Sequence, residues 1–168
     1  MGLYPAEIEA QAAAIVSTYR TRDWMIATAE SCTGGLIAGA LTEIAGSSAV
    51  VDRGFVTYTN QAKMDLIGVS AKVLEVYGAV SRETALQMAH GALMRSDADV
   101  AVAVTGIAGP GGGSAEKPVG LVHLALKTRS GFIDHRDMHY GDIGRSDVRL
   151  ATIRTAFEML SAAAQAPA

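Results

Sequence analysis

The chain has 168 residues, enough for one ordinary domain with its own buried core. Its 14 lysines and arginines against 17 aspartates and glutamates give a formal charge of −3, which argues against a nucleic-acid-binding arm and a polybasic membrane surface. No stretch approaches the roughly 18 apolar residues of a membrane span. The single cysteine, Cys32, excludes an internal disulfide, and Met1–Ala10 lack signal-peptide features, so we expect a cytoplasmic globular protein.

Helical and strand patterns alternate along the chain. Apolar spacing predicts a helix from Ala6 to about Tyr19, and an apolar run predicts a buried strand over Trp24–Ala29. The other expected elements are a helix from Leu36 to about Glu43, a strand over Val51–Thr59, a helix near Gln61 capped by Asn60, helices over Ser70–Tyr77 and Ser81–Met94, strands over Asp99–Val104, Val119–Lys127 and Phe132–Tyr140, and a helix after Gly144 whose end, from about Ala162 to Ala168, frays.

This order of elements predicts one three-layer α/β/α domain over residues 1–168. Its sheet is expected to be mixed but mostly parallel, with about five strands and one antiparallel member. The last two strands are joined by a short connection, so they should pair in an antiparallel manner. Asp134, Arg136 and Asp137 place the last strand at an edge of the sheet.

The turn after the first strand is one candidate site. In open α/β sheets, ligands gather beyond the carboxyl ends of the parallel strands, where Ser31–Gly35 leads into a helix. Unpaired amides at that helix start can stabilise an anion or an oxyanion. Alternatively, Ser31 and Thr33 are simple helix caps, and Gly34 and Gly35 only permit a tight turn. Cys32 beside Ser31 is either a second candidate nucleophile or a buried structural thiol.

A second polar group follows the next predicted strand. Tyr58 and Asn60 share one face of it by their spacing, and Lys63 lies about one helical turn later, so all three can face one cleft. A lysine serves as the base for a serine only when burial or neighbouring cations lower its pKa, and a tyrosine hydroxyl could relay the proton. The alternatives are a solvent-facing lysine and a tyrosine packed on the sheet.

Two further segments could bind an anion. Thr105 and Gly106 end a strand before a glycine-rich loop whose amides could hold phosphate, although the loop matches neither common nucleotide-binding pattern and is equally a plain surface loop. Arg145 and Arg149 lie four residues apart near the start of the last helix, so they can project on one face and hold a phosphate bidentately, or both can be solvated. The four histidines show no metal-ligand spacing, so we expect no metal and no cofactor.

Three ordered blocks, Thr28–Gly35, Tyr58–Lys63 and Thr105–Gly112, closely resemble the CinA C-terminal domain family. Pro118–Val122 and Gly144-Arg145 extend the resemblance over nearly the whole chain. It implies a nicotinamide-nucleotide amidohydrolase, which converts nicotinamide mononucleotide and water to nicotinate mononucleotide and ammonia in pyridine nucleotide salvage. Longer family members carry a pyrophosphatase-associated N-terminal domain; we expect none here and transfer no role in competence.

The resemblance also implies roles for individual residues. Ser31 corresponds to the nucleophile, Lys63 to the general base and Tyr58 to a hydroxyl in the same relay. Together with the spacing argument, the candidate substrate-binding residues are Thr33, Gly34, Gly35, Asn60, Thr105, Gly106 and Arg145. The competing hypotheses are a non-catalytic nucleotide-binding regulatory module and an amidase for another carboxamide. We expect a homodimer or dimer-based assembly, with no nucleic-acid or membrane partner.

Overall fold

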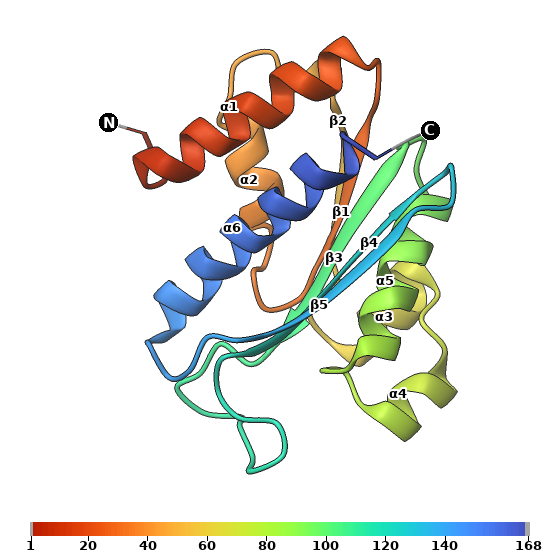
Figure 1. The fold of residues 1–168 in the computed structure, drawn as a ribbon. Coiled ribbons are helices and arrows are strands. Elements are labelled where there is room, and N and C mark those ends of the chain that lie inside the picture. The colour runs from red at the N-terminus through yellow and green to blue at the C-terminus, as the bar shows by residue number, and fades with distance from the viewer. Residues whose placement is uncertain (1, 167–168) are drawn as a thin grey trace.

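The computed structural model describes residues 2–166, which form alternating helices and strands (Figure 1). The helices are α1 (Ala6–Thr21), α2 (Leu36–Thr42), α3 (Asn60–Ile67), α4 (Ala71–Tyr77), α5 (Arg82–Met94) and α6 (Arg145–Ala163), with a 3₁₀ turn, η1, at Ser47–Ala49. The strands are β1 (Ile26–Glu30), β2 (Val51–Val56), β3 (Val100–Gly106), β4 (Leu121–Thr128) and β5 (Ile133–His139).

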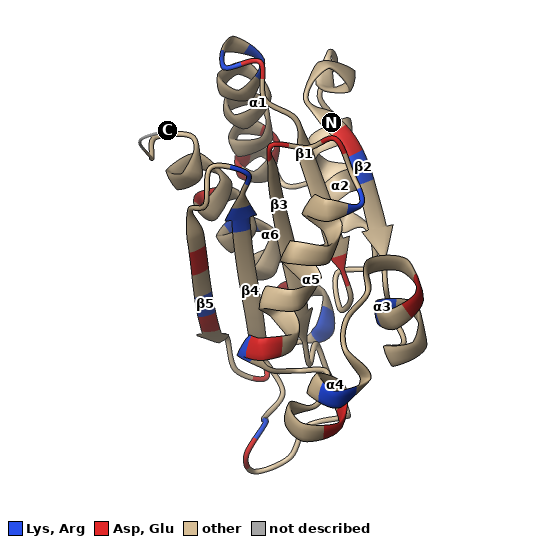
Figure 2. Cartoon of the chain, turned by 90° about the vertical axis from the view of Figure 1, so that its right-hand side faces the viewer, with Lys and Arg blue, Asp and Glu red and all other residues tan. Residues whose placement is uncertain are grey.

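The strands form one mixed sheet in the order β2-β1-β3-β4-β5. β1 pairs in parallel with both β2 and β3, whereas β4 is antiparallel to β3 and to β5. β4 is therefore the antiparallel member, and the predicted fold class is confirmed. β5 lies at an edge, where acidic and basic residues alternate along it (Figure 2).

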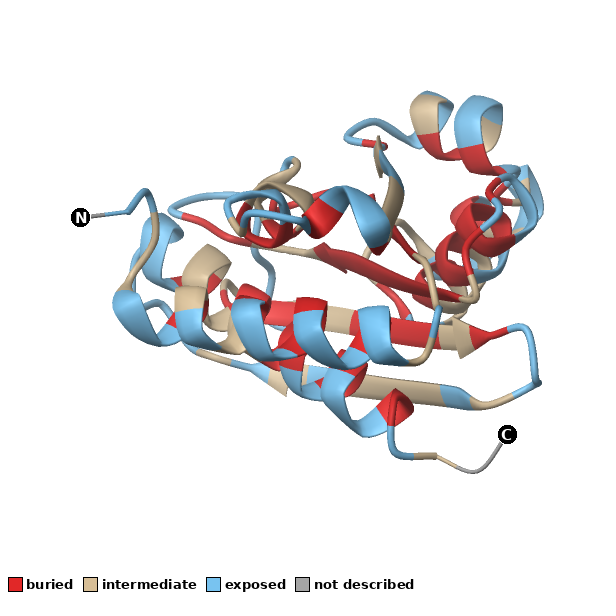
Figure 3. Ribbon diagram, turned by 90° about the horizontal axis from the view of Figure 1, so that it is seen from above, coloured by how far each residue is buried: buried red, intermediate tan, exposed pale blue. Residues whose placement is uncertain are grey.

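Helices cover both faces of the sheet. One buried cluster joins α1, α2 and α6 to the sheet, and a second joins α3, α4 and α5 to the opposite face (Figure 1). Seen from above, the buried residues lie on the sheet and on the inner sides of the helices, while the outer sides are exposed (Figure 3). Across residues 2–166, no helix is long and apolar enough to cross a bilayer.

The central strand β3 presents different side chains to the two faces. Its valines pack in the cluster with α1 and α6, whereas Ala101 and Ala103 pack in the cluster with α5. Small side chains on the facing surfaces of β3 and α5 allow this helix to lie close to the sheet. Gly91 of α5 likewise allows α5 to lie close to the end of α3, since a Cβ there would lie 1.8 Å from the Ile67 carbonyl oxygen.

The second strand is shorter than its pattern predicts. β2 ends at Val56, so Tyr58 and Asn60 do not share a strand face, and that expectation is wrong. The cap of α3 is Thr59 rather than Asn60, because Thr59 keeps an extended backbone and its Oγ1 accepts a hydrogen bond from the Ala62 N–H at 3.0 Å. Asn60 is already the first helical residue.

The C-terminal helix is also more ordered than predicted. α6 continues to Ala163, and Ala163 and Ala164 are buried in the core. The Tyr19 hydroxyl donates to the Leu160 carbonyl at 2.9 Å, and Arg22 donates to the Ala164 carbonyl. Fraying from Ala162 is therefore wrong for this part of the tail, because it packs against α1; residues 167–168 lie outside the described range.

Candidate active site

Ser31 lies where β1 leaves the centre of the sheet. Its backbone N–H donates to the Val104 carbonyl of β3 at 3.1 Å, so the first residue of the turn is still attached to the neighbouring strand. Ser31 is 8% exposed. The carboxyl ends of β1 and β3 meet here, as expected for a site in an open α/β sheet.

The Glu30 side chain holds the turn between β1 and α2 in place. The Glu30 carboxylate is fully buried and accepts hydrogen bonds from the N–H groups of Gly35 (3.1 Å), Ile37 (3.0 Å) and Ala38 (2.9 Å) at the start of α2. These are the helix-start amides that the sequence suggested for an oxyanion, and they are already occupied. Sequence reasoning missed Glu30; the available signal was an acid at the end of an apolar strand, just before a helix.

Lys63 reaches Ser31 from the side of α3. Its Nζ lies 3.0 Å from Ser31 Oγ, 2.9 Å from the Thr57 carbonyl oxygen and 3.3 Å from the Tyr58 carbonyl oxygen. The side chain is 1% exposed, and burial lowers the pKa of Lys63 from 10.5 to about 8. The lysine is thus not on the solvent face of its helix, and at mildly alkaline pH about half of it carries a free amine.

Cys32 is less suited to nucleophilic attack than Ser31. It is buried, and that burial, together with the negative charge of Glu30, raises the pKa of the thiol to about 12. The thiolate is the reactive form of cysteine, so very little of it exists at neutral pH. Cys32 also has no base at hydrogen-bonding distance among the described residues, whereas Ser31 has Lys63.

Tyr58 and Arg145 form a bridge at the mouth of the site. Arg145 Nη2 donates to the Tyr58 hydroxyl at 2.9 Å, and Nη1 donates to the Gly109 carbonyl at 2.8 Å. Tyr58 is 56% exposed. Its hydroxyl has no hydrogen bond to Ser31 or Lys63, which contact each other directly, so a relay through Tyr58 stays a prediction.

A cavity of about 210 Å³ opens beside Ser31. The candidate residues that line it are Ser31, Cys32, Tyr58, Lys63, Thr105, Gly106 and Arg145, and Ala79, Val80 and Ala108 complete its wall. Thr105 is held in place because its Oγ1 donates to the Ala79 carbonyl at 2.8 Å. Gly106 is required for close approach: a Cβ there would lie 2.6 Å from Val122 Cγ2.

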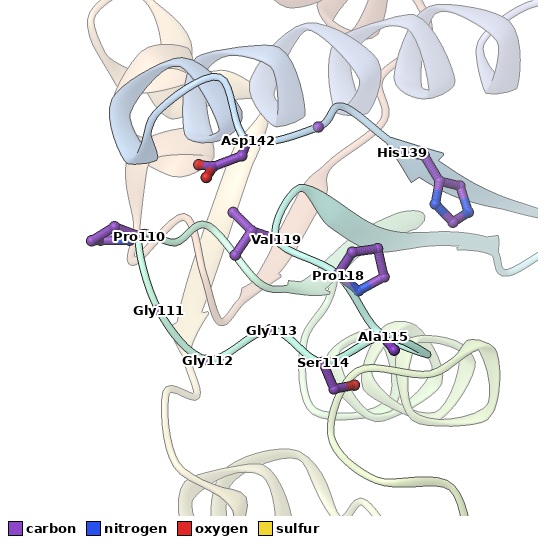
Figure 4. A pocket seen from close by; sticks show the side chains of 11 residues that line it. Pro110, Gly111, Gly112, Gly113, Ser114, Ala115, Pro118, Val119, His139 and Asp142 are labelled. Carbon is purple, nitrogen blue, oxygen red and sulfur yellow. The ribbon is translucent and has the colours of Figure 1, made fainter.

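A wider, open cavity of about 700 Å³ lies over the glycine-rich loop (Figure 4). Residues 110–115 of the loop form one side, and Val119, His139 and Asp142 form the other. Arg145 connects the loop to the smaller cavity, because it lines that cavity and donates to the carbonyl of Gly109, the residue before Pro110. The loop is therefore part of the surroundings of the site.

Five of the candidate residues do not line the Ser31 cavity. Thr33, Gly34 and Gly35 form the turn behind it, and positive φ angles of 59° and 99° explain the two glycines. Asn60 is exposed at the start of α3. Arg149 also lies outside the cavity, because its Nη2 donates to the Thr33 carbonyl at 3.1 Å.

The chain is similar to proteins of one family over nearly its whole length. Residues 8–164 match the family model of the CinA C-terminal domain. The chain is 57% identical over 117 residues to the nicotinamide-nucleotide amidohydrolase PncC of Enterobacter agglomerans, covering 70% of this chain and 71% of that protein. It is 59% identical over 109 residues to a CinA-like protein of Syntrophobacter fumaroxidans, which covers 65% of this chain but only 26% of that longer protein.

A solved structure supports the same relationship. The competence/damage inducible protein CihA from Agrobacterium tumefaciens matches with a TM-score of 0.96 and 69% identity, over 96% of this chain and 98% of that chain. Sequence and fold agree over the segments that carry Ser31, Lys63 and Arg145. The chain therefore belongs to the CinA C-terminal domain family.

Proposed function

We propose that this protein is a nicotinamide-nucleotide amidohydrolase, which converts nicotinamide mononucleotide and water to nicotinate mononucleotide and ammonia. The observation that carries the proposal is the 3.0 Å contact between Ser31 Oγ and the buried Lys63 Nζ. A serine beside a lysine of lowered pKa is an arrangement suited to acyl transfer. The similarity to PncC supports the nicotinamide nucleotide as the substrate.

The backbone around Lys63 favours its role as a base. A neutral amine carries two hydrogens and one lone pair, and the Thr57 and Tyr58 carbonyl oxygens are placed to accept the two hydrogens. The lone pair is then left for the Ser31 hydroxyl, which donates to it. Burial supplies the neutral form, because it disfavours the ammonium.

The reaction proceeds in two halves. Ser31 Oγ attacks the carboxamide carbon while its proton moves to Lys63 Nζ, and the carbonyl oxygen becomes an oxyanion. The carbon–nitrogen bond then breaks, Lys63 returns the proton to the nitrogen, and ammonia leaves an acyl-enzyme. Water attacks this ester with Lys63 again as base, and the acid is released with Ser31 restored.

We assign the phosphate of the nucleotide to Arg145. Its guanidinium lies at the mouth of the Ser31 cavity and is bonded to a tyrosine hydroxyl and a carbonyl, with no carboxylate partner among the described residues. A phosphate could displace the Tyr58 hydroxyl and make charge-assisted hydrogen bonds there. The ribose would extend toward the glycine-rich loop, and the ring with its carboxamide would enter the smaller cavity.

The released Tyr58 hydroxyl would then be free for the predicted relay. The proposal places the reaction in pyridine nucleotide salvage in the cytoplasm, with no metal required because Ser31 and Lys63 supply nucleophile and base. A regulatory nucleotide-binding module would share the phosphate contact, but it would give no reason for a lysine of lowered pKa beside a serine.

The test is the production of ammonia and nicotinate mononucleotide from nicotinamide mononucleotide by the purified protein, with and without a chelator. We expect turnover that persists after chelation and is lost in Ser31→Ala, while the variant still binds the nucleotide. Equal turnover in Ser31→Ala would refute the serine mechanism. A folded wild-type protein that binds the nucleotide without releasing ammonia would favour the regulatory module.

A further inference from the structure

The turn between β1 and α2 contains few amides that could stabilise an oxyanion. The Ser31 N–H donates to Val104, the Gly34 N–H donates to the Ser31 carbonyl, and the Leu36 N–H donates to the Thr33 carbonyl. Glu30 takes the amides of Gly35, Ile37 and Ala38. Within this segment, the amides of Cys32 and Thr33 donate to no oxygen of another described residue.

Cys32 is the better placed of these two residues. It lines the 210 Å³ cavity together with Ser31 and Lys63, whereas Thr33 does not. The amide of the residue that follows a nucleophilic serine is well suited to an oxyanion, because it lies within one peptide unit of the attacking oxygen. The group of interest at Cys32 is therefore its backbone N–H, and its buried thiol takes no part in the reaction.

We propose that the backbone N–H of Cys32 holds the oxyanion of the tetrahedral intermediate and that Glu30 is the positioning residue for this amide. The assignment rests on the proposed amidohydrolase function. When Ser31 Oγ bonds to the carboxamide carbon and its proton passes to Lys63, the negative charge on the former carbonyl oxygen meets the Cys32 N–H. When the carbon–nitrogen bond breaks, the electron pair returns from that oxygen and the hydrogen bond weakens.

Glu30 acts on Cys32 through the geometry of the turn. Its carboxylate links the end of β1 to the start of α2 by three hydrogen bonds, and these bonds span the residues on both sides of the Ser31-Cys32 peptide. Because the carboxylate is fully buried, no solvent replaces it when it is removed. Occupied helix-start amides also give the oxyanion no competing donors at α2.

The direct test uses nuclear magnetic resonance of the ¹⁵N-labelled wild-type protein with 3-pyridylboronic acid. Ser31 Oγ bonds to the boron, its proton goes to Lys63, and the resulting tetrahedral boronate carries the negative charge of the intermediate. We expect a downfield shift of the Cys32 amide proton, with smaller shifts for Gly35, Ile37 and Ala38. A Ser31 adduct that leaves the Cys32 amide unshifted overturns the assignment.

The second test is the variant Glu30→Gln, which keeps the shape of the side chain but removes the charge and one acceptor. We expect kcat to fall by about 100-fold, the typical effect of a lost oxyanion donor, with KM changed by less than about threefold. Asp99→Asn is the matched control, because Asp99 accepts the Met25 N–H at the opposite end of β1. We expect that variant to keep the wild-type kcat.

The outcomes separate this inference from the function itself. A folded Glu30→Gln variant with kcat within about threefold of the wild type overturns the positioning role of Glu30. If Glu30→Gln does not fold, the boronate shift of the wild-type protein decides the assignment alone. A wild-type protein that forms the boronate adduct but does not hydrolyse nicotinamide mononucleotide refutes the proposed substrate, while the Cys32 amide shift still reports on the oxyanion contact.

Discussion

Replacing Lys63 by methionine measures the cost of keeping an ammonium group in the interior. Burial lowers the pKa of Lys63 from 10.5 to about 8. Each pH unit of difference corresponds to about 1.4 kcal/mol, so the protonated side chain destabilises the native state by on the order of 3 kcal/mol below pH 8. Between pH 8 and the unfolded-state pKa, the unfolded chain binds more protons than the native protein, so the free energy of unfolding rises with pH.

The assay is urea unfolding of the wild type and Lys63→Met at about pH 7.5 and about pH 10.5. Methionine fills a similar volume and does not titrate, so the wild type should gain about 3 kcal/mol relative to the variant over this interval. Lys72→Met is the control, since the Lys72 side chain is 76% exposed and its removal should not alter the pH dependence. Unfolding free energies of wild type and Lys63→Met that change in parallel would refute a lowered pKa at Lys63.

Three further changes test the assignments around the site. Arg145→Ala should raise KM by about tenfold or more with a smaller change in kcat, because it removes charge-assisted contacts to the phosphate; an unchanged KM in steady-state kinetics would exclude this role. Tyr58→Phe should lower KM with a smaller change in kcat, since it removes the hydroxyl that the phosphate displaces from Arg145, whereas a loss confined to kcat would instead support the relay. Cys32→Ala should retain ammonia release, because the thiol is buried with a pKa near 12, and complete loss in a folded variant would return the cysteine to consideration. In the wild type, kcat/KM should rise with pH toward a plateau above about pH 8, as Lys63 loses its proton, and a flat profile would contradict a lysine base.

The layered fold follows from local sequence patterns. Apolar runs, helical spacing and the glycine-rich breaks predict the order of helices and strands, and the short connection before β5 predicts its antiparallel pairing. Each of these patterns involves only neighbouring residues, so the sequence alone is enough to predict the elements that they form. The boundaries differ where a tertiary contact decides them, as at Ala163, which packs into the core instead of fraying.

The site depends more heavily on contacts between distant segments. Spacing alone leaves Lys63 open as a surface residue, because its burial requires the Thr57 and Tyr58 carbonyls and a serine 32 positions away. The capping role of Glu30 is equally hard to foresee, since the amides that it binds belong to the following helix. Water competes with the carboxylate for these amides until the strand is buried. The Arg145 contact with Tyr58 joins α6 to the connection between β2 and α3 across 87 positions.

The small side chains around the cavity have a consequence for how this domain can diversify. Ala79, Val80 and Ala108 form its wall, outside the strands and helices that hold Ser31 and Lys63. Under the proposed function, these side chains bound the space for the acyl group, and none of them takes part in the serine–lysine contact. Under the proposed function, acyl-group selectivity and nucleophile activation would be encoded in separate segments, so a lineage could exchange one carboxamide for another while its reaction chemistry stays constant.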